Sequence, residues 1–282
     1  MHLTNSDFQA LIQKVHRDTG LDLTQYKPTF VQRRLASRLR AKGVSSYRAY
    51  MRLLDEDEYR SLLDTLTINL TSFFRDTSTF LALRDEVLRP LLRKREKTGT
   101  RRLDIWSAGC ASGEEPYSVA IMIHQLLGRQ LHGWRIRILG TDIDRRKLQQ
   151  ARLAVYNSFS FRGTDWPHLD RYFTKTSTGK QLNPHIKQLV QFRQHDLIAD
   201  RPPGRFDIIL CRNVLIYLKR GQQTQILNKF YQALSGEGVL VLGKTEILPT
   251  EVSSLFQPIN TREHIHRKRL ERHEFHSPSK KE

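Results

Sequence analysis

The sequence predicts a two-part protein, in which a small all-α domain precedes an α/β domain built on a mostly parallel sheet with helices on both faces. Three observations lead to this fold class. Helical patterns without a convincing strand occupy residues 1–75, strand-like and helical segments alternate from residue 102 onward, and turn residues interrupt this alternation between 157 and 192. The interruption predicts a small antiparallel insertion.

Apolar residues recur at helical spacing in the N-terminal part of the chain. The clearest patterns are Phe8-Leu11-Ile12-Val15 and Tyr47-Tyr50-Met51-Leu54, and the breaks between helices fall at Gly20, Pro28 and Gly43. We therefore predict a helical domain over residues 1–75.

A basic stretch lies within this domain. No acidic residue occurs from Thr24 to Leu54, whereas the stretch contains Lys27, Arg33, Arg34, Arg38, Arg40, Lys42, Arg48 and Arg52. Arg34 and Arg38 are four residues apart and share one helix face, while Val31, Leu35 and Leu39 share another. The pattern predicts an amphipathic basic helix, and the net charge of +18 indicates an acidic partner.

A longer helix is predicted to follow the helical domain. Asp76 or Thr77 can cap it, and one side is apolar through Phe80, Leu83, Val87, Leu88 and Leu91. The basic polar segment from Arg93 to Arg102 ends the helix as a linker. We therefore assign 76–101 to a linker helix and 102–270 to the α/β domain.

The stretch from Trp106 to Ser118, W-S-A-G-C-A-S-G-E-E-P-Y-S, joins a strand end, a glycine turn and a helix start. Gly109 and Gly113 allow a sharp turn and a close approach to a ligand, and Ser112 can cap the helix. Pro116 suits the first helical turn. A pocket is therefore expected at the carboxyl end of the strand.

The ligand of this pocket is indicated by charge. The glycine spacing differs from the G-x-G-x-x-G of dinucleotide sites, and Glu114 and Glu115 stand where a pyrophosphate would approach. A cationic or zwitterionic ligand is favoured, of which S-adenosylmethionine is the common example. By itself, the loop leaves open whether it binds that cofactor or is an ordinary strand–helix turn.

The next strand ends in an acidic residue. Asp142 lies at its tip, where it can accept hydrogen bonds from both hydroxyls of a ribose. The alternative is that Asp142 and Asp144 only cap the following helix, predicted from Arg145 to Arg152, and we expect this role for Asp144. The strand-like segments of the whole domain are 102–107, 135–141, 189–193, 206–211 and 238–243.

The insertion and the C-terminus are marked by turn and charge composition. Turn residues occur at 176–180 and at Asn183-Pro184, so residues 157–192 are predicted to form a small β-subdomain. The basic run Arg267 to Arg272 leads into a polar end, and residues 271–282 are predicted to be a flexible tail.

Composition limits the remaining possibilities. The chain has 282 residues, 38% hydrophobic and 27% charged, with no apolar run near the ~18 residues of a membrane span. We expect a cytoplasmic protein without membrane insertion. The only cysteines are Cys110 and Cys211, which argues against a disulfide framework and a four-ligand zinc site. No metal is expected.

Three motifs in order resemble the chemotaxis receptor methyltransferase (CheR) family. They are N-L-T-S-F-F-R-D at 69–76, G-C-A-S-G-E-E-P-Y-S at 109–118 and F-D-I-I-L-C-R-N-V-L-I-Y at 206–217. The resemblance extends to about Lys268. It implies a Rossmann-like S-adenosylmethionine-dependent methyltransferase domain, which esterifies glutamate side chains on the cytoplasmic helical bundle of chemoreceptors. The products are glutamate methyl esters and S-adenosylhomocysteine, formed in sensory adaptation.

The resemblance also implies site residues. Arg75 and Tyr217 would lie at the reacting centre, Glu115 would hold the methionine ammonium and Asp142 the ribose. Asp196 and Leu197 stand where the family contacts the adenine, although members often have Asn at the first position. The complete set of implied cofactor contacts is Asn69, Thr71, Arg75, Glu115, Asp142, Asp196, Leu197, Asn213 and Val214.

The chemistry of methyl transfer to a carboxylate agrees with this set of site residues. Glutamate has a reference pKa of about 4.3, so the nucleophile is ionised at neutral pH and no general base is required. Alignment of the reactants can contribute roughly 7–11 kcal/mol. We expect Arg75 and Tyr217 to align the carboxylate.

The resemblance also suggests a binding partner for the basic helix. Arg33, Arg34, Arg38 and Arg40 are predicted to dock the Glu-rich helices of a receptor. In part of the family, the insertion docks a short peptide at the C-terminus of the receptor, which acts as a tether. The turn at 174–184 is shorter than in those members, so the resemblance predicts that no such tether is required here. A monomer is expected.

Two alternatives use the same observations. The charge of +18 is typical of a nucleic-acid methyltransferase, but Cys211-Arg-Asn-Val214 differs from the Asn/Asp-Pro-Pro-aromatic loop of amine methylation. The N-terminal domain also lacks interleaved exposed aromatics for base stacking. No nucleic acid is therefore expected. A non-catalytic receptor adapter would show damage at Arg75, Glu115, Asp142 or Tyr217, and these residues are intact.

Overall fold

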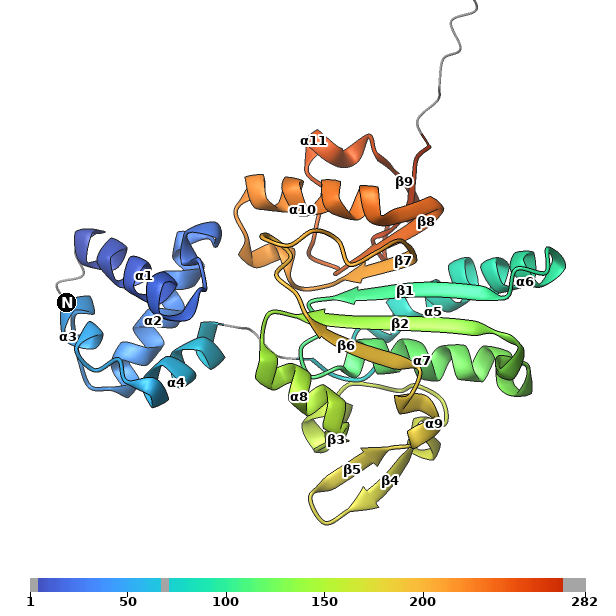
Figure 1. Cartoon of the computed structure of the whole chain (residues 1–282), viewed down its shortest axis with the longest axis horizontal. Helices are drawn as coiled ribbons and strands as arrows, with labels where there is room; N and C mark the ends of the chain where they lie inside the picture. The colour runs from blue at the N-terminus through green and yellow to red at the C-terminus, as the bar shows by residue number, and fades with distance from the viewer. Residues whose placement is uncertain (1–4, 67–70, 271–282) are drawn as a thin grey trace, which may run out of the picture.

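The computed structural model describes residues 5–66 and 71–270. A group of short helices forms the N-terminal part, and an α/β domain with a central sheet forms the rest (Figure 1). The predicted flexible tail at 271–282 lies outside the described residues. Among those described, no helix is long and apolar enough to cross a membrane.

The N-terminal helices are α1 (Asn5–Thr19), α2 (Pro28–Ala41), α3 (Tyr47–Met51) and α4 (Glu56–Leu66), with a 3₁₀ turn η1 (Leu23–Gln25). The first predicted apolar pattern lies on α1, and the second lies on α3 except for Leu54, which follows the end of that helix. Both patterns pack into one core with the buried Val31, Leu35 and Leu39 of α2. Pro28 occupies the first turn of α2, where a missing N–H is tolerated. The basic helix therefore has the predicted apolar and basic sides.

A buried carboxylate ties the basic helix to α4. Glu58 is 1% exposed and accepts two hydrogen bonds from the Arg38 guanidinium, at 2.9 and 2.7 Å. The Tyr50 hydroxyl donates to it, and Lys42 forms an ion pair at 3.0 Å. Burial opposes the charge, but these donors together hold the pKa of Glu58 low, at about 2.

A long helix follows, in three stretches: α5 (Thr77–Ala82), the π-helical η2 (Leu83–Leu88) and α6 (Arg89–Lys97). Its start after Asp76 agrees with the sequence. The predicted linker from Arg93 was wrong in part, because the helix continues to Lys97 and buries Leu92. The wider π-helical spacing precedes Pro90, which lacks an N–H for the regular pattern.

The central sheet has seven strands in the order β6-β2-β1-β7-β8-β10-β9. The first five in that order are parallel, and β10 pairs antiparallel with both β8 and β9. The bounds are β1 (Arg102–Ala108), β2 (Arg135–Asp142), β6 (Val190–Gln194), β7 (Phe206–Cys211), β8 (Leu234–Leu242), β9 (Phe256–Asn260) and β10 (Ile265–Lys268). All five predicted strands are present.

The antiparallel strands β10 and β9, of which β9 is the edge of the sheet, were missed by the sequence analysis. Their residues are largely half-buried or exposed, and β9 contains Pro258, so neither has the apolar run of a central strand. They place an antiparallel edge beside β8.

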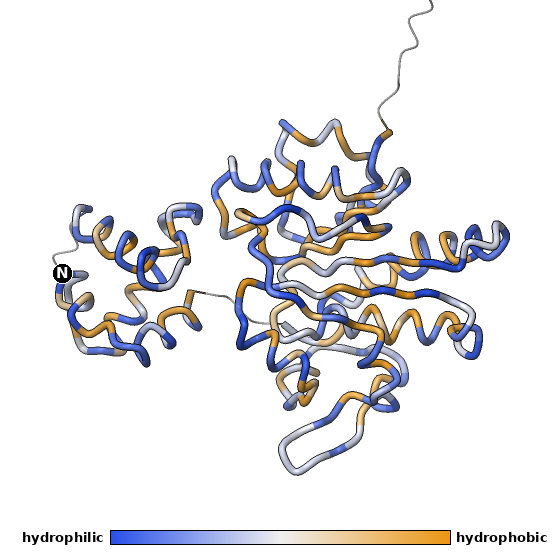
Figure 2. Tube along the Cα trace, in the orientation of Figure 1, coloured by the Kyte–Doolittle hydropathy of each residue, from blue (hydrophilic) through white to orange (hydrophobic). Residues whose placement is uncertain are grey.

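Helices cover both faces of the sheet. They include α7 (Glu114–Leu127), α8 (Arg145–Leu153), α10 (Arg220–Ala233) and the short α11 (Thr250–Ser253). Alternate residues of β7 enter opposite cores: Ile208 and Leu210 pack with α7, whereas Ile209 and Cys211 pack with α10. The apolar strands lie between these layers (Figure 2).

The predicted insertion is a three-stranded antiparallel sheet in the order β3-β5-β4. Its strands are β3 (Val155–Tyr156), β4 (Phe173–Thr176) and β5 (Gly179–Leu182), and the short α9 (Pro184–Lys187) leads back to β6. It begins two residues before the predicted boundary at 157.

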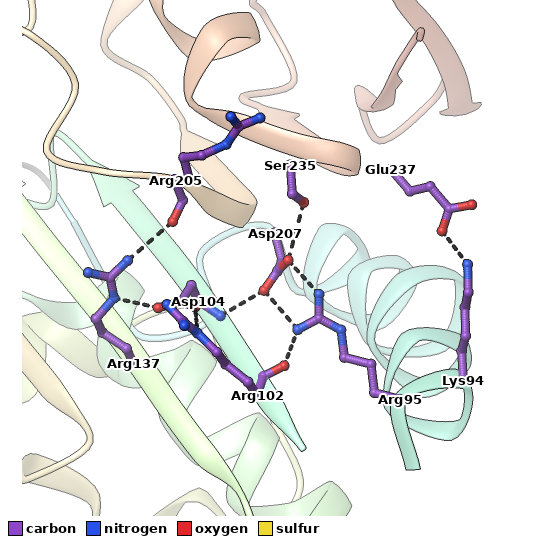
Figure 3. A network of polar contacts seen from close by, with 9 residues as sticks. All are labelled: Lys94, Arg95, Arg102, Asp104, Arg137, Arg205, Asp207, Ser235 and Glu237. Carbon is purple, nitrogen blue, oxygen red and sulfur yellow. Dashed lines mark hydrogen bonds and ion pairs between the residues drawn. The ribbon is translucent and has the colours of Figure 1, made fainter. Parts of the chain in front are cut away.

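A polar network joins the amino ends of the strands (Figure 3). Asp207 of β7 accepts hydrogen bonds from Arg95 of α6 at 2.9 and 2.5 Å, and from the backbone N–H of Asp104 at 2.9 Å. Asp104 itself accepts from Arg102 and from Arg137 of β2. These contacts tie α6, β1, β2 and β7 together at the end of the sheet opposite the glycine loop.

The Glu58 cluster generates a stability prediction. Glu58→Gln removes the charge that pairs with Arg38 and Lys42, and we expect it to lower the free energy of unfolding by about 2 kcal/mol at neutral pH. Because the pKa of Glu58 falls from 4.5 to about 2 on folding, its contribution is present above pH 4.5 and is lost as the pH falls toward 2. Urea unfolding at a series of pH values measures both effects.

Asp57→Asn is the matched control, because Asp57 lies on the same helix with its side chain 82% exposed. We expect a change within about 0.5 kcal/mol. Equal effects of the two substitutions would contradict a special role for the buried carboxylate.

Candidate active site

A pocket lies at the carboxyl ends of β1, β2, β6 and β7, and the N-terminal helices contribute to its wall. The glycine loop, the tip of β2 and the segments after β6 and β7 meet there. The residues lining it are Tyr26, Phe30, Leu66, Thr71, Ser72, Arg75, Gly109, Cys110, Ala111, Glu115, Asp142, Ile143, His195, Asp196, Leu197, Ile198, Arg212, Asn213, Val214, Tyr217 and Leu218.

The glycine loop after β1 requires its glycines. Gly109 has φ +80°, and a Cβ there would lie 2.5 Å from a methyl carbon of Val214. Gly113 has φ +90° and is the N-cap of α7. The expected cap by Ser112 was wrong, because a left-handed Gly113 occupies that position and the Ser112 hydroxyl instead donates to Glu114 at 2.8 Å.

The two glutamates of the loop have different surroundings. Glu114 is buried and accepts hydrogen bonds from Ser112 and Ser160, on the side of the insertion. Glu115 lines the pocket and accepts from Ser107 at 2.7 Å and from Arg212 at 3.3 Å. Burial raises the pKa of Glu115, and the nearby Arg212 opposes that shift.

Arg212 is a site residue that the sequence analysis missed. Its side chain is 3% exposed, and one of its terminal nitrogens donates to the Arg75 carbonyl and the Asp76 carboxylate, both at 2.8 Å. Its Nε is buried without a hydrogen-bond partner within residues 5–66 and 71–270. The available signal was an arginine directly after the wholly buried strand β7.

Asp142 is held rigidly at the tip of β2. Its Oδ2 accepts from the Ala111 N–H at 2.8 Å, and its Oδ1 accepts from the Asp144 N–H at 2.9 Å. Burial raises its pKa against these hydrogen bonds. Asp144 caps α8 through the N–H groups of Arg146 and Lys147, as predicted.

Arg75 is placed by two buried phenylalanines. The ring of Phe74 stacks on Trp166, with centroids 3.9 Å apart and planes within 4°. The backbone N–H of Phe74 donates to the Ser118 hydroxyl at 2.9 Å. Phe73 packs among aromatic residues of the insertion. With both preceding rings anchored, Arg75 lines the pocket, as Thr71 does. Asn69 lies outside the described residues.

Tyr217 lies where the N-terminal part meets the α/β domain. Its carbonyl accepts from the Lys27 N–H at 2.9 Å, and Tyr26 and Leu218 form an antiparallel bridge. The Phe30 ring lies 4.9 Å from the Tyr217 ring. Tyr26 was also missed: it lines the pocket, and burial, followed by the charges of Asp196 and Asp142, raises its pKa to about 12.

Asp196 and Leu197 line the pocket after β6. The Asp196 carboxylate also closes a turn, since its Oδ1 accepts from the N–H groups of Ile198 and Ala199 at 2.7 and 3.2 Å. Its geometry is therefore set by the local backbone.

The structure brings together nine of the residues that the resemblance implied. They are Thr71, Arg75, Glu115, Asp142, Asp196, Leu197, Asn213, Val214 and Tyr217. The four arginines of α2 lie outside the pocket wall, and they differ from one another. Arg33 and Arg40 are exposed, Arg34 lies over the Phe30 ring at 5.6 Å, and Arg38 is committed to Glu58.

The fold and the pocket define a class. A parallel sheet with a glycine loop after β1 and an acidic residue at the tip of β2 is suited to a nucleoside ligand. A buried carboxylate beside a buried guanidinium fits the ammonium and carboxylate of an amino acid. S-adenosylmethionine carries both parts, and the class is that of the S-adenosylmethionine-dependent methyltransferases.

Comparison with known proteins is more specific. The family models "CheR methyltransferase, SAM binding domain" and "CheR methyltransferase, all-alpha domain" match residues 69–265 and 6–67. "Chemotaxis protein methyltransferase 2" of Pseudomonas aeruginosa is 36% identical, over 87% of this chain and 88% of the relative. The chemotaxis protein methyltransferases of Listeria monocytogenes and Escherichia coli are 34% and 32% identical, over 85% and 86% of this chain and 89% and 85% of the relatives.

The chain belongs to the CheR family of chemotaxis protein methyltransferases, which use S-adenosylmethionine to methylate glutamates of chemoreceptors. The resemblance recognised in the three sequence motifs is confirmed.

The charge of the pocket predicts that its affinity for ligand depends on pH. Glu115 must be ionised to attract an ammonium group, and an ionised Asp142 accepts from both ribose hydroxyls. Burial raises both pKa values, so affinity for S-adenosylhomocysteine should fall as the pH is lowered below neutral. Glu115→Gln should weaken binding by about 2 kcal/mol, roughly thirtyfold, and reduce the pH dependence. Calorimetric titration at several pH values measures this.

Glu114→Gln is the neighbouring control, because Glu114 bonds to two serines and does not line the pocket. The affinity of this variant for S-adenosylhomocysteine should stay within about twofold of that of the unsubstituted protein. A change of this size is smaller than the free energy of one hydrogen bond. A pH-independent affinity in the unsubstituted protein would contradict the assignment of Glu115.

Proposed function

We propose that the pocket residues divide the cofactor among them. Glu115 binds the ammonium and Arg212 the carboxylate of the amino-acid end, Asp142 binds the ribose hydroxyls, and Leu197 lies against the adenine with Asp196. Asn69, Thr71, Asn213 and Val214 complete the contacts. The observation that carries the proposal is the buried Glu115–Arg212 pair, in which Arg212 has an Nε without a hydrogen-bond partner in the described chain.

The bound cofactor supplies an electrophilic methyl group. The receptor glutamate is already ionised, so the protein has to orient a carboxylate rather than remove a proton. We assign that task to Arg75 and Tyr217. A guanidinium and a phenol can each donate to a carboxylate oxygen and thereby fix its direction of attack. The Arg75 contact must remain modest in strength, because the negative charge disappears as the ester forms.

We assign receptor docking to the exposed side of α2. Arg33, Arg34 and Arg40 are the members of the predicted set that can meet acidic side chains of a receptor helix. We no longer assign receptor docking to Arg38, because its guanidinium is already paired with Glu58. Arg38 instead stabilises the packing of α2 against α4. α2 starts directly after Lys27, which bonds to the Tyr217 backbone, so a docked receptor helix would lie next to the reacting centre.

The proposed partner is the cytoplasmic helical bundle of a chemoreceptor, met by a monomeric enzyme in the cytoplasm. Nucleic acid is not a proposed substrate. Incubation with tritiated S-adenosylmethionine and receptor, RNA or DNA fractions tests the partner directly. We expect base-labile label on the receptor, because carboxyl esters hydrolyse in base, whereas base-stable label or label on nucleic acid would contradict the proposal.

The docking surface can be tested by charge reversal. Arg33→Glu with Arg40→Glu should lower kcat/KM for the receptor by about tenfold or more, and more strongly at low salt, while the affinity for S-adenosylhomocysteine is unchanged. Arg93→Glu with Lys97→Glu makes the same change in net charge on the exposed side of α6. That control should retain receptor methylation, and equal losses in the two double variants would refute docking on α2.

The orienting role of Arg75 predicts a loss in the chemical step. Arg75→Gln should lower the single-turnover rate at saturating receptor and cofactor by about a hundredfold, because the receptor carboxylate loses the donor that fixes its direction of attack. Arg89→Gln is the control, since Arg89 pairs with the exposed Asp85 away from the pocket. A normal single-turnover rate in Arg75→Gln would remove Arg75 from the reacting centre.

A further inference from the structure

Glu246 is a buried carboxylate without a role in the site as described so far. It follows the end of β8 in the segment Gly243-Lys-Thr-Glu246, and it is 3% exposed. Four backbone N–H groups donate to it. Oε2 accepts from Asn213 at 2.9 Å and from Gly243 at 2.6 Å, and Oε1 accepts from Val214 at 2.9 Å and Leu215 at 2.7 Å.

The three amides at 213–215 belong to the loop that forms one wall of the pocket. Asn213 has φ +60°, a left-handed conformation that is uncommon for a residue with a side chain. This turn directs three successive N–H groups toward one point, where no strand or helix partner is available to them. The carboxylate of Glu246 satisfies all three and thereby stabilises the turn.

The loop carries residues from both halves of the site. Val214 lies against Gly109, where a Cβ would meet it at 2.5 Å, so the loop limits the position of the glycine turn. The 3₁₀ turn η6 (Leu215–Tyr217) continues directly from the clamped amides to Tyr217. A shift of this backbone would move the cofactor wall and Tyr217 together.

The approach of the two segments is close. A Cβ on Gly243 would lie 2.8 Å from Glu246 Oε2 and 2.9 Å from the Asn213 nitrogen. Glycine is therefore required for the carboxylate to reach the loop.

We propose that Glu246 is a positioning residue for methyl transfer, which holds the backbone of 213–215 in its binding shape before the cofactor arrives. This inference rests on the roles proposed for Asn213, Val214 and Tyr217. Both carboxylate oxygens are needed, because the NH₂ group of an amide in place of either one would face two N–H donors.

Glu246→Gln tests the proposal by removing one acceptor with almost no change in size. We expect affinity for S-adenosylhomocysteine to fall about tenfold to a hundredfold, and the single-turnover rate at saturating substrates to fall as well, because buried donors are left unsatisfied. Wild-type affinity and rate in the folded variant would overturn the proposal.

Glu263→Gln is the matched control. Glu263 is 4% exposed and accepts from Thr79 at 2.6 Å and Ser78 at 3.1 Å, and it is not bonded to 213–215. A purely structural role predicts that both variants lower the melting temperature and keep wild-type kinetics once folded. The positioning role predicts that only Glu246→Gln changes the affinity and the single-turnover rate.

Two further measurements decide the question if Glu246→Gln does not fold. Gly243→Ala keeps the carboxylate but pushes it from the loop, and should weaken S-adenosylhomocysteine binding in the same way. In the unsubstituted protein, the amides of 213–215 should exchange slowly with solvent even without cofactor. Fast exchange that becomes slow only on cofactor binding would overturn the proposal. All these binding readouts are independent of whether the receptor is the substrate.

Discussion

The buried guanidinium of Arg212 is the contact on which the arrangement of the site depends. It joins Glu115 at the start of α7 to the Arg75 carbonyl and Asp76 at the start of the long helix, although its own backbone belongs to the end of β7. Removing a charge from water is costly unless that charge is paired and hydrogen-bonded. The three segments must therefore meet at one place, and the pocket residues that they carry meet with them.

The pocket is also defined by its acidic surroundings. Asp142 and Glu115 are desolvated with raised pKa values, and Glu246 contributes to the upward shift at Glu115. A site of this sign disfavours a pyrophosphate and favours a sulfonium with an ammonium group. Apart from Arg75 and Arg212, most of the positive charge lies outside the pocket, including on α2 and α6, where it can attract acidic macromolecules without repelling the cofactor.

The N-terminal helices are part of the site as well as a neighbouring surface. Lys27 and Gln25 pair with the backbone on either side of Leu218, and Phe30 packs on Tyr217. Because α2 begins within a few residues of these contacts, a macromolecule bound to α2 lies next to Tyr217. Receptor docking and the alignment of the reacting carboxylate are thus connected through short-range contacts.

The sequence alone determined the order of elements, the position of the glycine loop and the acidic tip of β2, because strand periodicity and glycine and proline positions are local properties. Most of the other pocket residues came from the resemblance of the three motifs to the CheR family. The sequence placed Asp144 as a helix cap and Asp142 at a strand tip, and both lie there. Tertiary structure alone decided the partners of buried charges. Arg38 belongs to Glu58, Arg212 to Glu115, and Glu246 to three amides more than thirty positions away. Such pairings depend on which distant segments share a water-free interior, and no local pattern records that.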